Sequence, residues 1–300
     1  METISLLEDI LIRRQTPSGG WSFFGSSQVS VEATCLALLA VGSLTPESGS
    51  HRLDWLLGRQ QRDGSWPAFL GDRESSWTTA LALSVLNVMS DVVPARERAF
   101  QWLLKEHGRE ANWLWQWKFR IADRNVRFNP AMYGWPWSVG AASWVIPTAF
   151  SLVAIKQFTA CKRVVDAEKR IQLGVGMLLD RACPGGGWNS GNNVVYGVPL
   201  RPHVEATAIA LLALQDEEPV SAVGAGLAWL KKSARTTRSA ESLAWSILTL
   251  FLYQEPIEDL KSSLAMIVGE GTGVPNNSTL ATSLLALKCG RMIHPFAVLR

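Results

Sequence analysis

Two glutamates stand at the same position of a repeated tetrapeptide and are the first candidates for chemistry. The sequence Val-Glu-Ala-Thr occurs twice, so Glu32 and Glu205 each stand at the start of a long apolar run. A carboxyl group buried beside apolar side chains has a raised pKa and can donate a proton near neutral pH. A glutamate in the first turn of a helix also has a structural explanation, because it stabilises the helix dipole. Both interpretations remain open.

Two further polar residues join this candidate acid–base set. His203 lies two residues before Glu205 and is a candidate base, or a group that orients the Glu205 carboxyl. Glu74 lies in the loop before another apolar run and is a later choice of acid. A histidine beside a proline is also common in ordinary loops, so His203 has a structural explanation of its own.

Tryptophan is the most unusual component of the composition, with 14 residues in a chain of 300. Trp77 and Trp144 begin apolar runs, and we expect these two rings to face a ligand, since aromatic faces attract cations. The other candidates for substrate binding lie in turns and in a polar loop: Trp135, Trp137, Trp188, Asn189, Asn192 and Tyr196. For Trp188, clamping of adjacent repeats is the stronger expectation.

The sequence predicts neither a metal site nor a cofactor. The four cysteines have no Cys-x-x-Cys spacing. Asp180, Cys183 and His203 could form an improvised zinc site, because Cys and His are zinc ligands, but their spacing matches no zinc motif.

An alternation of two helix types runs through the chain. Six segments are apolar on all sides, and each follows an amphipathic segment with apolar residues every three or four positions. The expected apolar helices cover 31–41, 76–86, 143–155, 202–214, 241–252 and 279–289. The expected amphipathic helices cover 3–14, 51–60, 95–106, 167–180, 221–232 and 257–268. Because an apolar helix is buried on every side, we predict an all-α (α/α)6 toroid of six helix pairs, with residues 1–300 as one domain and a cavity at one end of the inner ring.

One segment departs from this alternation. Trp113, Trp115, Trp117, Phe119 and Ile121 alternate strictly with other residues, which predicts a β-hairpin insertion near 112–129. The hairpin would cover part of the rim with its aromatic side chains packed on helices. Alternatively, it would form an aromatic lip over the cavity, or a patch that touches a membrane surface beside Lys118, Arg120 and Arg127.

The turns before the apolar helices carry a family resemblance. Gln61-Arg62-Asp63-Gly64-Ser65-Trp66 resembles the Gln-Trp repeat of squalene–hopene and oxidosqualene cyclases, whose wider superfamily includes protein prenyltransferase β-subunits. Similar copies are Gly-Gly-Trp at 19–21, Gly-Gly-Gly-Trp at 185–188 and Gly-Trp-Pro-Trp at 134–137. The resemblance covers essentially the whole chain and implies a toroid with an isoprenoid ligand. It is far more specific for the fold than for the reaction.

The chain departs from the motifs of those families. It lacks the Asp-x-Asp-Asp acid motif and the Asp-Asp-x-x-Asp diphosphate motif. Full-length cyclases of the family also carry a second helical domain, for which 300 residues leave no room. The prenyltransferase zinc ligands Asp and Cys are not preserved around His203-Val204-Glu205.

The favoured function is binding and transformation of an isoprenoid or similar apolar lipid in the cavity, by a non-standard terpenoid cyclase or prenyl-transfer enzyme with Glu205 as the acid. The alternative is a non-catalytic lipid-binding or scaffold toroid. A carbohydrate-active (α/α)6 enzyme with Glu32 and Glu205 as its carboxylates is a third, less favoured alternative.

The net charge and the hydropathy of the chain limit the classes of partner that it is expected to bind. A net charge of +3 without a Lys/Arg cluster argues against nucleic acid. The N-terminus lacks an apolar signal core, and no apolar run reaches the roughly 18 residues of a membrane span. We therefore expect a cytoplasmic location, with peripheral membrane contact as an alternative. Whether a partner subunit completes the site stays open.

Overall fold

The computed structural model describes residues 2–25, 28–42, 53–89, 93–121, 128–160, 164–217, 220–269 and 276–298. Six helices form an inner layer: α2 (Val31–Val41), α4 (Thr78–Met89), α7 (Val145–Thr159), α9 (Val204–Ala213), α11 (Ala240–Leu252) and α13 (Asn277–Lys288). The outer layer contains a short helix over 53–57 together with α1 (Glu2–Arg13), α5 (Val93–Lys105), α8 (Val165–Asp180), α10 (Ser221–Ser233) and α12 (Glu258–Gly269).

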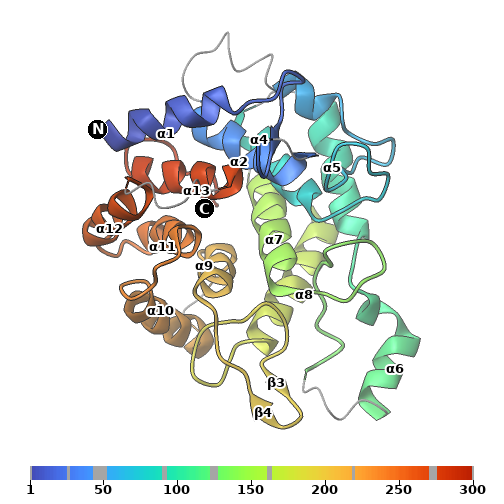
Figure 1. Ribbon diagram of the computed structural model, residues 1–300. Coiled ribbons are helices and arrows are strands. Elements are labelled where there is room, and N and C mark those ends of the chain that lie inside the picture. The colour runs from blue at the N-terminus through green and yellow to red at the C-terminus, as the bar shows by residue number, and fades with distance from the viewer. Residues whose placement is uncertain are drawn as a thin grey trace.

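The inner helices close into a ring (Figure 1). Each packs against the next in the order α2, α4, α7, α9, α11 and α13, and α13 packs back against α2. Closure explains the sequence pattern, because a helix with two ring neighbours, an outer helix and the ring interior has no face for solvent. In α2 all residues except Glu32 are buried. The predicted (α/α)6 toroid is confirmed.

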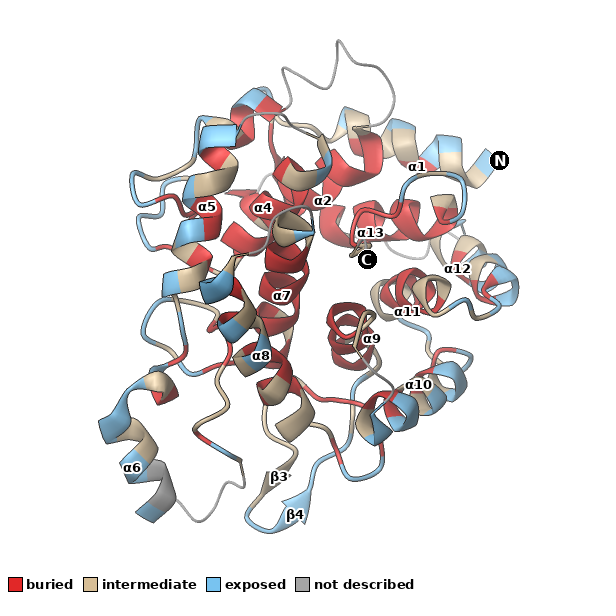
Figure 2. Ribbon diagram, turned by 180° about the vertical axis from the view of Figure 1, so that it is seen from behind, coloured by how far each residue is buried: buried red, intermediate tan, exposed pale blue. Residues whose placement is uncertain are grey.

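The outer helices cover the ring from outside (Figure 2). Their apolar stripes pack inward, and their other faces are exposed. In α12, for example, Leu260 and Leu264 are buried one turn apart. This is the spacing of three and four on which the amphipathic helices were predicted.

Side-chain caps define where several inner helices begin. Ser30 Oγ accepts from the Ala33 N–H at 3.3 Å at the start of α2. Asn276 Oδ1 accepts from the Thr279 N–H at 2.8 Å at the start of α13. Such caps satisfy backbone N–H groups that have no partner within the helix.

The predicted hairpin near 112–129 is wrong. Residues Trp113–Ile121 form helix α6, which follows the short 3-10 helix η1 (Arg109–Ala111). Trp113, Trp117 and Ile121 are four residues apart, so the alternating pattern also contained a helical stripe. The expected turn at 122–125 and most of the return strand at 126–128 lie outside the described residues. The strands that the structure does contain form two small antiparallel pairs: β1 (Trp21–Ser22) with β2 (Val29–Ser30), and β3 (Val194–Val195) with β4 (Val198–Pro199).

The C-terminal segment is held against the inner ring at the ends of α7 and α9. Gln157 near the end of α7 donates to the Pro295 carbonyl at 2.8 Å, and Gln215 after α9 donates to the Phe296 carbonyl at 2.9 Å. The Phe296 side chain is fully buried. The segment therefore packs at the end of the ring opposite the first turns of the inner helices.

Candidate functional site

Four glycine–tryptophan turns fix the first turns of four inner helices in the same way. In each, the tryptophan backbone N–H donates to a threonine Oγ1 in the inner helix, and the indole N–H donates to a carbonyl of the preceding outer helix. The pairs are Trp21 with Thr34, Trp66 with Thr79, Trp135 with Thr148 and Trp188 with Thr207, each at 2.9 Å. The hydrogen bonds of Trp188 thus clamp α8 to α9 within one helix pair, whereas clamping of adjacent repeats was expected. Trp135 and Trp188 are 1% and 0% exposed, so these two candidate substrate residues lie inside the wall.

Backbone hydrogen bonds join successive turns around the rim. The N–H of Val31 donates to Ala68 at 3.0 Å, that of Trp77 to Trp137 at 3.1 Å, and that of Val145 to Ser190 at 3.0 Å. The first turn of each of these helices is therefore tied to the loop of the following repeat. Such ties hold the helix ends in register and position the side chains that project from them.

Three carboxyl groups gather at the first turns of the inner helices. Glu32, Glu205 and Glu241 are each the second residue of their helix, in α2, α9 and α11. Burial, followed by the charge of Glu241, raises the pKa of Glu32 to about 7. The same two causes raise the pKa of Glu205 to about 7. Glu205 adds a smaller contribution at Glu32, so the three groups interact electrostatically. The structure thus brings together the two glutamates singled out from the sequence.

Glu241 was not among the residues chosen from the sequence. Burial raises its pKa, and the Thr279 hydroxyl, which donates to Glu241 Oε2 at 3.1 Å, acts in the opposite direction. The apolar run after Glu241 was recognised, but Leu243 stands where the other repeats have a threonine. Position was the usable signal, because Ser239 caps α11 and makes Glu241 its second residue, as in α2 and α9.

Aromatic rings cluster on the inner helices below these carboxyls. Trp245 lies one turn after Glu241 on α11, and its ring centroid is 5.3 Å from that of Phe150 on α7. Phe150 also contacts Trp77 at 5.6 Å and Phe296 at 5.9 Å. Trp77 in turn meets Trp137 edge to face at 5.0 Å. Two of the sequence candidates, Trp77 and Trp137, therefore belong to one aromatic cluster with rings from α7, α11 and the C-terminal segment.

Three other candidates lie on the surface. His203 is the exposed residue before α9, and its side chain makes no capping hydrogen bond. Glu74 is exposed in the loop before α4. Tyr196 is 76% exposed in the turn between β3 and β4. These three residues are exposed, whereas Glu32, Glu205 and Glu241 are half-buried.

The polar loop after Trp188 shapes a second small site. Asn189 is buried and binds its own loop, donating to the Asn192 carbonyl at 2.8 Å and accepting from the Gly191 N–H at 2.8 Å. Asn192 accepts a hydrogen bond from Arg181. A pocket of about 130 Å³ lies here, between these residues and Trp144, which is 39% exposed.

Two buried ionic groups line this pocket. Arg181 is 3% exposed, and burial lowers its pKa. Glu110 is 1% exposed and accepts from the Ser143 N–H at 3.1 Å. The pocket thus offers a cation, a carboxylate and an amide beside an indole ring. This combination suits a neutral hydroxylated group better than an ion.

The improvised zinc site does not form within the described residues. There, no group of three or more His, Cys, Asp and Glu side chains is arranged to hold a metal ion. Asp180 accepts from the Asn129 N–H at 2.8 Å, and Cys183 accepts a weak bond from Asn189 at 3.7 Å. Both candidate ligands therefore have local partners.

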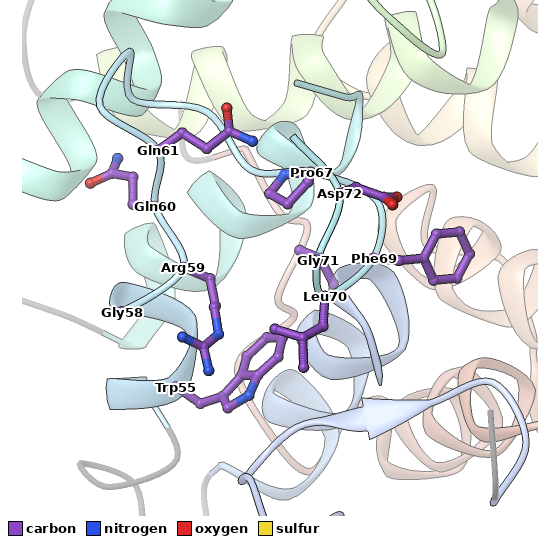
Figure 3. A pocket seen from close by; sticks show the side chains of 11 residues that line it. Trp55, Gly58, Arg59, Gln60, Gln61, Pro67, Phe69, Leu70, Gly71 and Asp72 are labelled. Atoms are coloured by element: carbon purple, nitrogen blue, oxygen red, sulfur yellow. The ribbon is translucent and has the colours of Figure 1, made fainter. Parts of the chain in front are cut away.

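Another pocket, of about 190 Å³, lies beside the segment 55–61 and the loop 67–72 (Figure 3). Arg59 lies over the Trp55 ring, 5.7 Å from its centroid. The Trp55 indole N–H is buried and donates no hydrogen bond within the described residues. The carboxyls of Glu32, Glu205 and Glu241 do not line this pocket, so it is separate from their cluster.

Comparison with solved structures supports the fold. A novel alpha-amylase from Clostridium perfringens aligns with 96% of this chain and 98% of its own, with a TM-score of 0.66 and 12% identity. An inactive alpha-1,6-mannanase variant from Salegentibacter, in complex with alpha-1,6-mannotriose, has a TM-score of 0.60 and 10% identity over 96% and 98%. A type II terpene cyclase from Scytonema has a TM-score of 0.58 and 14% identity over the same shares.

The chain shares the toroid fold with these proteins. No family model and no curated protein matches its sequence. The terpene cyclase alignment extends over nearly the whole of both chains, so that chain and this one are similar in extent. At these identities the comparisons establish the fold and leave the substrate class to be argued from the site.

Proposed function

We propose that this chain is a proton-transfer enzyme that acts on an isoprenoid or similar apolar lipid, with Glu205 as the proton donor. The carrying observation is the cluster of Glu32, Glu205 and Glu241 at the first turns of three inner helices, with the pKa of the first two raised to about 7. A general acid works best when its pKa lies near the operating pH. Such a cluster retains a proton at neutral pH while another member can be ionised.

The electrostatics favour a particular type of reacting group. A carboxyl with a pKa near 7 is a weak acid, so protonation of a substrate oxygen, such as a hydroxyl, ether or epoxide, is far easier than protonation of an isolated alkene. Glu205 would donate to that oxygen. Glu241, whose charge already acts on Glu205, would be the base that accepts a proton in return.

The cluster also disfavours a prenyl diphosphate. Three carboxyl groups repel a diphosphate anion, and two cations near this part of the sequence are not placed to offset that repulsion. Arg201 is exposed before α9, and Lys231 pairs with Glu255 at 2.7 Å on the outer face. A neutral lipid fits better, because it meets no such repulsion. The half-buried rings of Trp77 and Trp137, which meet edge to face at 5.0 Å, offer an aromatic surface that can also stabilise a developing positive charge.

Product analysis tests this proposal. Purified protein is incubated with squalene, oxygenated isoprenoids and a graded set of prenyl diphosphates, and extracts are analysed by mass spectrometry. We expect turnover of a neutral oxygenated isoprenoid, loss of at least a hundredfold in Glu205→Gln, and no change in Glu258→Gln, which alters a glutamate that is 84% exposed on α12. Absence of turnover across the whole set, with no lipid retained through purification, would instead support the scaffold alternative.

A carbohydrate substrate is the second candidate, and the pocket beside Trp144 favours it. Glycoside hydrolysis needs one protonated and one ionised carboxyl, which the glutamate cluster can supply. Glu110, Arg181 and Asn192 could bind sugar hydroxyls beside the exposed Trp144 ring. Two of the structures with the same fold are an alpha-amylase and a mannanase. Release of reducing ends from starch or alpha-1,6-mannan, abolished in Glu205→Gln, would replace the lipid proposal.

A further inference from the structure

Helix α6 stands apart from the toroid and exposes large apolar side chains. Among the described elements it packs on η1, and in both views it projects from the edge of the molecule (Figures 1 and 2). Trp113 is 71% exposed, Trp117 60% and Ile121 56%. These three residues are four apart and share one face of the helix. Leu114, 53% exposed, extends that face.

A second apolar projection lies on the same edge. The β3–β4 hairpin projects from the same end of the molecule as α6 in Figures 1 and 2. Tyr196 at its turn is 76% exposed, and Val198 on β4 is 60% exposed. Two segments that project from the same end of the molecule thus carry exposed apolar side chains. A flat partner can contact both, whereas a narrow groove cannot.

The charges on this edge identify the partner. The sequence of α6 contains Lys118 and Arg120 and no acidic residue. Lys118 and Arg109 both lie over the Trp115 ring, at 4.5 and 5.0 Å from its centroid. Trp115 is two residues from both Trp113 and Trp117, so the two cations lie on the side of the helix that faces away from these indoles. Exposed indoles and aliphatic side chains flanked by cations are typical of segments that bind the interface of an anionic bilayer.

Two other occupants fit less well. A second copy of this chain, docked symmetrically through α6, would pair two helices whose sequences carry cations and no carboxylate. A membrane span is excluded by length, because a helix of 9 residues is only about 14 Å long. No helix in the described part of the chain is long and apolar enough to cross a bilayer. The helix can therefore lie in the plane of the headgroups but cannot traverse the membrane.

We propose that the edge formed by α6 and the β3–β4 hairpin docks onto an anionic lipid surface. Trp113, Trp117 and Ile121 enter the headgroup region, and Lys118 contacts lipid phosphates. The hairpin supplies the second contact through Tyr196 and Val198. This proposal rests on surface residues alone and does not depend on the chemistry of the glutamate cluster.

Vesicle co-sedimentation tests the proposal with the full chain. Wild type is mixed with vesicles of phosphatidylcholine and phosphatidylglycerol in equal parts, or with phosphatidylcholine alone, at low and high salt. We expect binding to the anionic vesicles that weakens at least tenfold in pure phosphatidylcholine and again at high salt. The Trp113→Ser/Trp117→Ser double variant should lose at least tenfold in affinity. The Val198→Ser variant should lose affinity for the anionic vesicles by a smaller factor.

A matched control separates specific docking from general stickiness. The Met266→Ser/Ile293→Ser variant removes two side chains that are 63% and 83% exposed elsewhere on the molecule, and its binding should equal that of wild type. Equal binding of wild type and the Trp113→Ser/Trp117→Ser variant would overturn the proposal. The proposal would also be overturned if wild type bound none of the vesicles and if light scattering showed that wild type forms dimers and the double variant does not.

Discussion

Glu205 and Glu241 occupy the same position of two adjoining inner helices, and the charge of Glu241 adds to burial in raising the pKa of Glu205 to about 7. The helices that carry them, α9 and α11, pack directly against each other. Two carboxylates held in this way cannot both ionise without cost, so the pair retains a proton into the neutral range. The ionisation of each of these two carboxyl groups therefore affects the other.

Stability should depend on pH through Glu32. Its pKa rises from 4.5 to about 7 on folding, so the folded chain holds this proton more tightly than the unfolded chain does. Its contribution is complete below the unfolded pKa and is lost as the pH rises through the folded one. As the pH rises from 5 to 8, the free energy of unfolding of Glu32→Gln should therefore increase by about 1–3 kcal/mol relative to that of wild type. Urea unfolding at both pH values measures this, and a constant difference between the two proteins would refute it.

His294 should give the opposite dependence. Burial lowers its pKa from 6.5 to about 4, while its Nε2, 3.1 Å from the Leu248 carbonyl, makes a bond that opposes the shift. The folded chain thus resists protonating this ring, and its stabilising contribution is lost as the pH falls from about 6.5 to about 4. Between pH 7 and pH 4, the free energy of unfolding of His294→Gln should fall by about 2 kcal/mol less than that of wild type. Thermal unfolding across this range tests the slope, and parallel curves would contradict it.

The hydrogen bond between Trp188 and Thr207 should contribute measurably to the free energy of unfolding. Thr207→Val removes the acceptor for the buried Trp188 N–H, which lies 2.9 Å from Thr207 Oγ1. An unsatisfied buried donor costs about 1–3 kcal/mol. The free energy of unfolding of Thr207→Val should fall by that amount. Thr236→Val, at an exposed turn position, should change it by less than about 0.5 kcal/mol. Similar values for the two variants would argue against the clamp.

The C-terminal segment should contribute through Phe296. Its ring is fully buried and lies 5.5 Å from that of Trp245 and 5.9 Å from that of Phe150. Phe296→Ala should cost about 3–5 kcal/mol, because it leaves a cavity among these rings. The neighbouring Ile293, 83% exposed, gives a control, since Ile293→Ala should have almost no effect. Chemical denaturation of both variants decides the matter, and an unaffected Phe296→Ala would show that the segment is not part of the core.

Much of the fold could be predicted because buried helices have an unmistakable composition. The run from Val31 to Val41 was predicted with the bounds that the structure has, since it is apolar on every face. Segment 113–121 could not be assigned in the same way. Its side chains are largely exposed, so no buried face selected between the strand and helix patterns that both fit Trp113, Trp117 and Ile121.

The site was predictable only in part, for a related reason. Glu32 and Glu205 share a tetrapeptide, whereas Glu241 shares with them only its distance from the start of a helix. Trp135 and Trp188 have the composition of ligand-binding residues, but their indole N–H groups are bound to Leu103 and Leu178 of the outer helices. Composition identifies candidates, and the direction of each side chain follows only from packing.

The central claim is that the three glutamates form one proton-sharing site. A ¹³C NMR titration of the glutamate carboxyl carbons, with signals assigned through single Glu→Gln variants, tests this most directly. We predict that Glu32 and Glu205 titrate near pH 7, and that Glu241→Gln lowers both values by on the order of half a unit or more. Two results together would contradict the account: all three carboxyls of wild type titrate near pH 4.5, and Glu241→Gln leaves the pKa values of Glu32 and Glu205 unchanged.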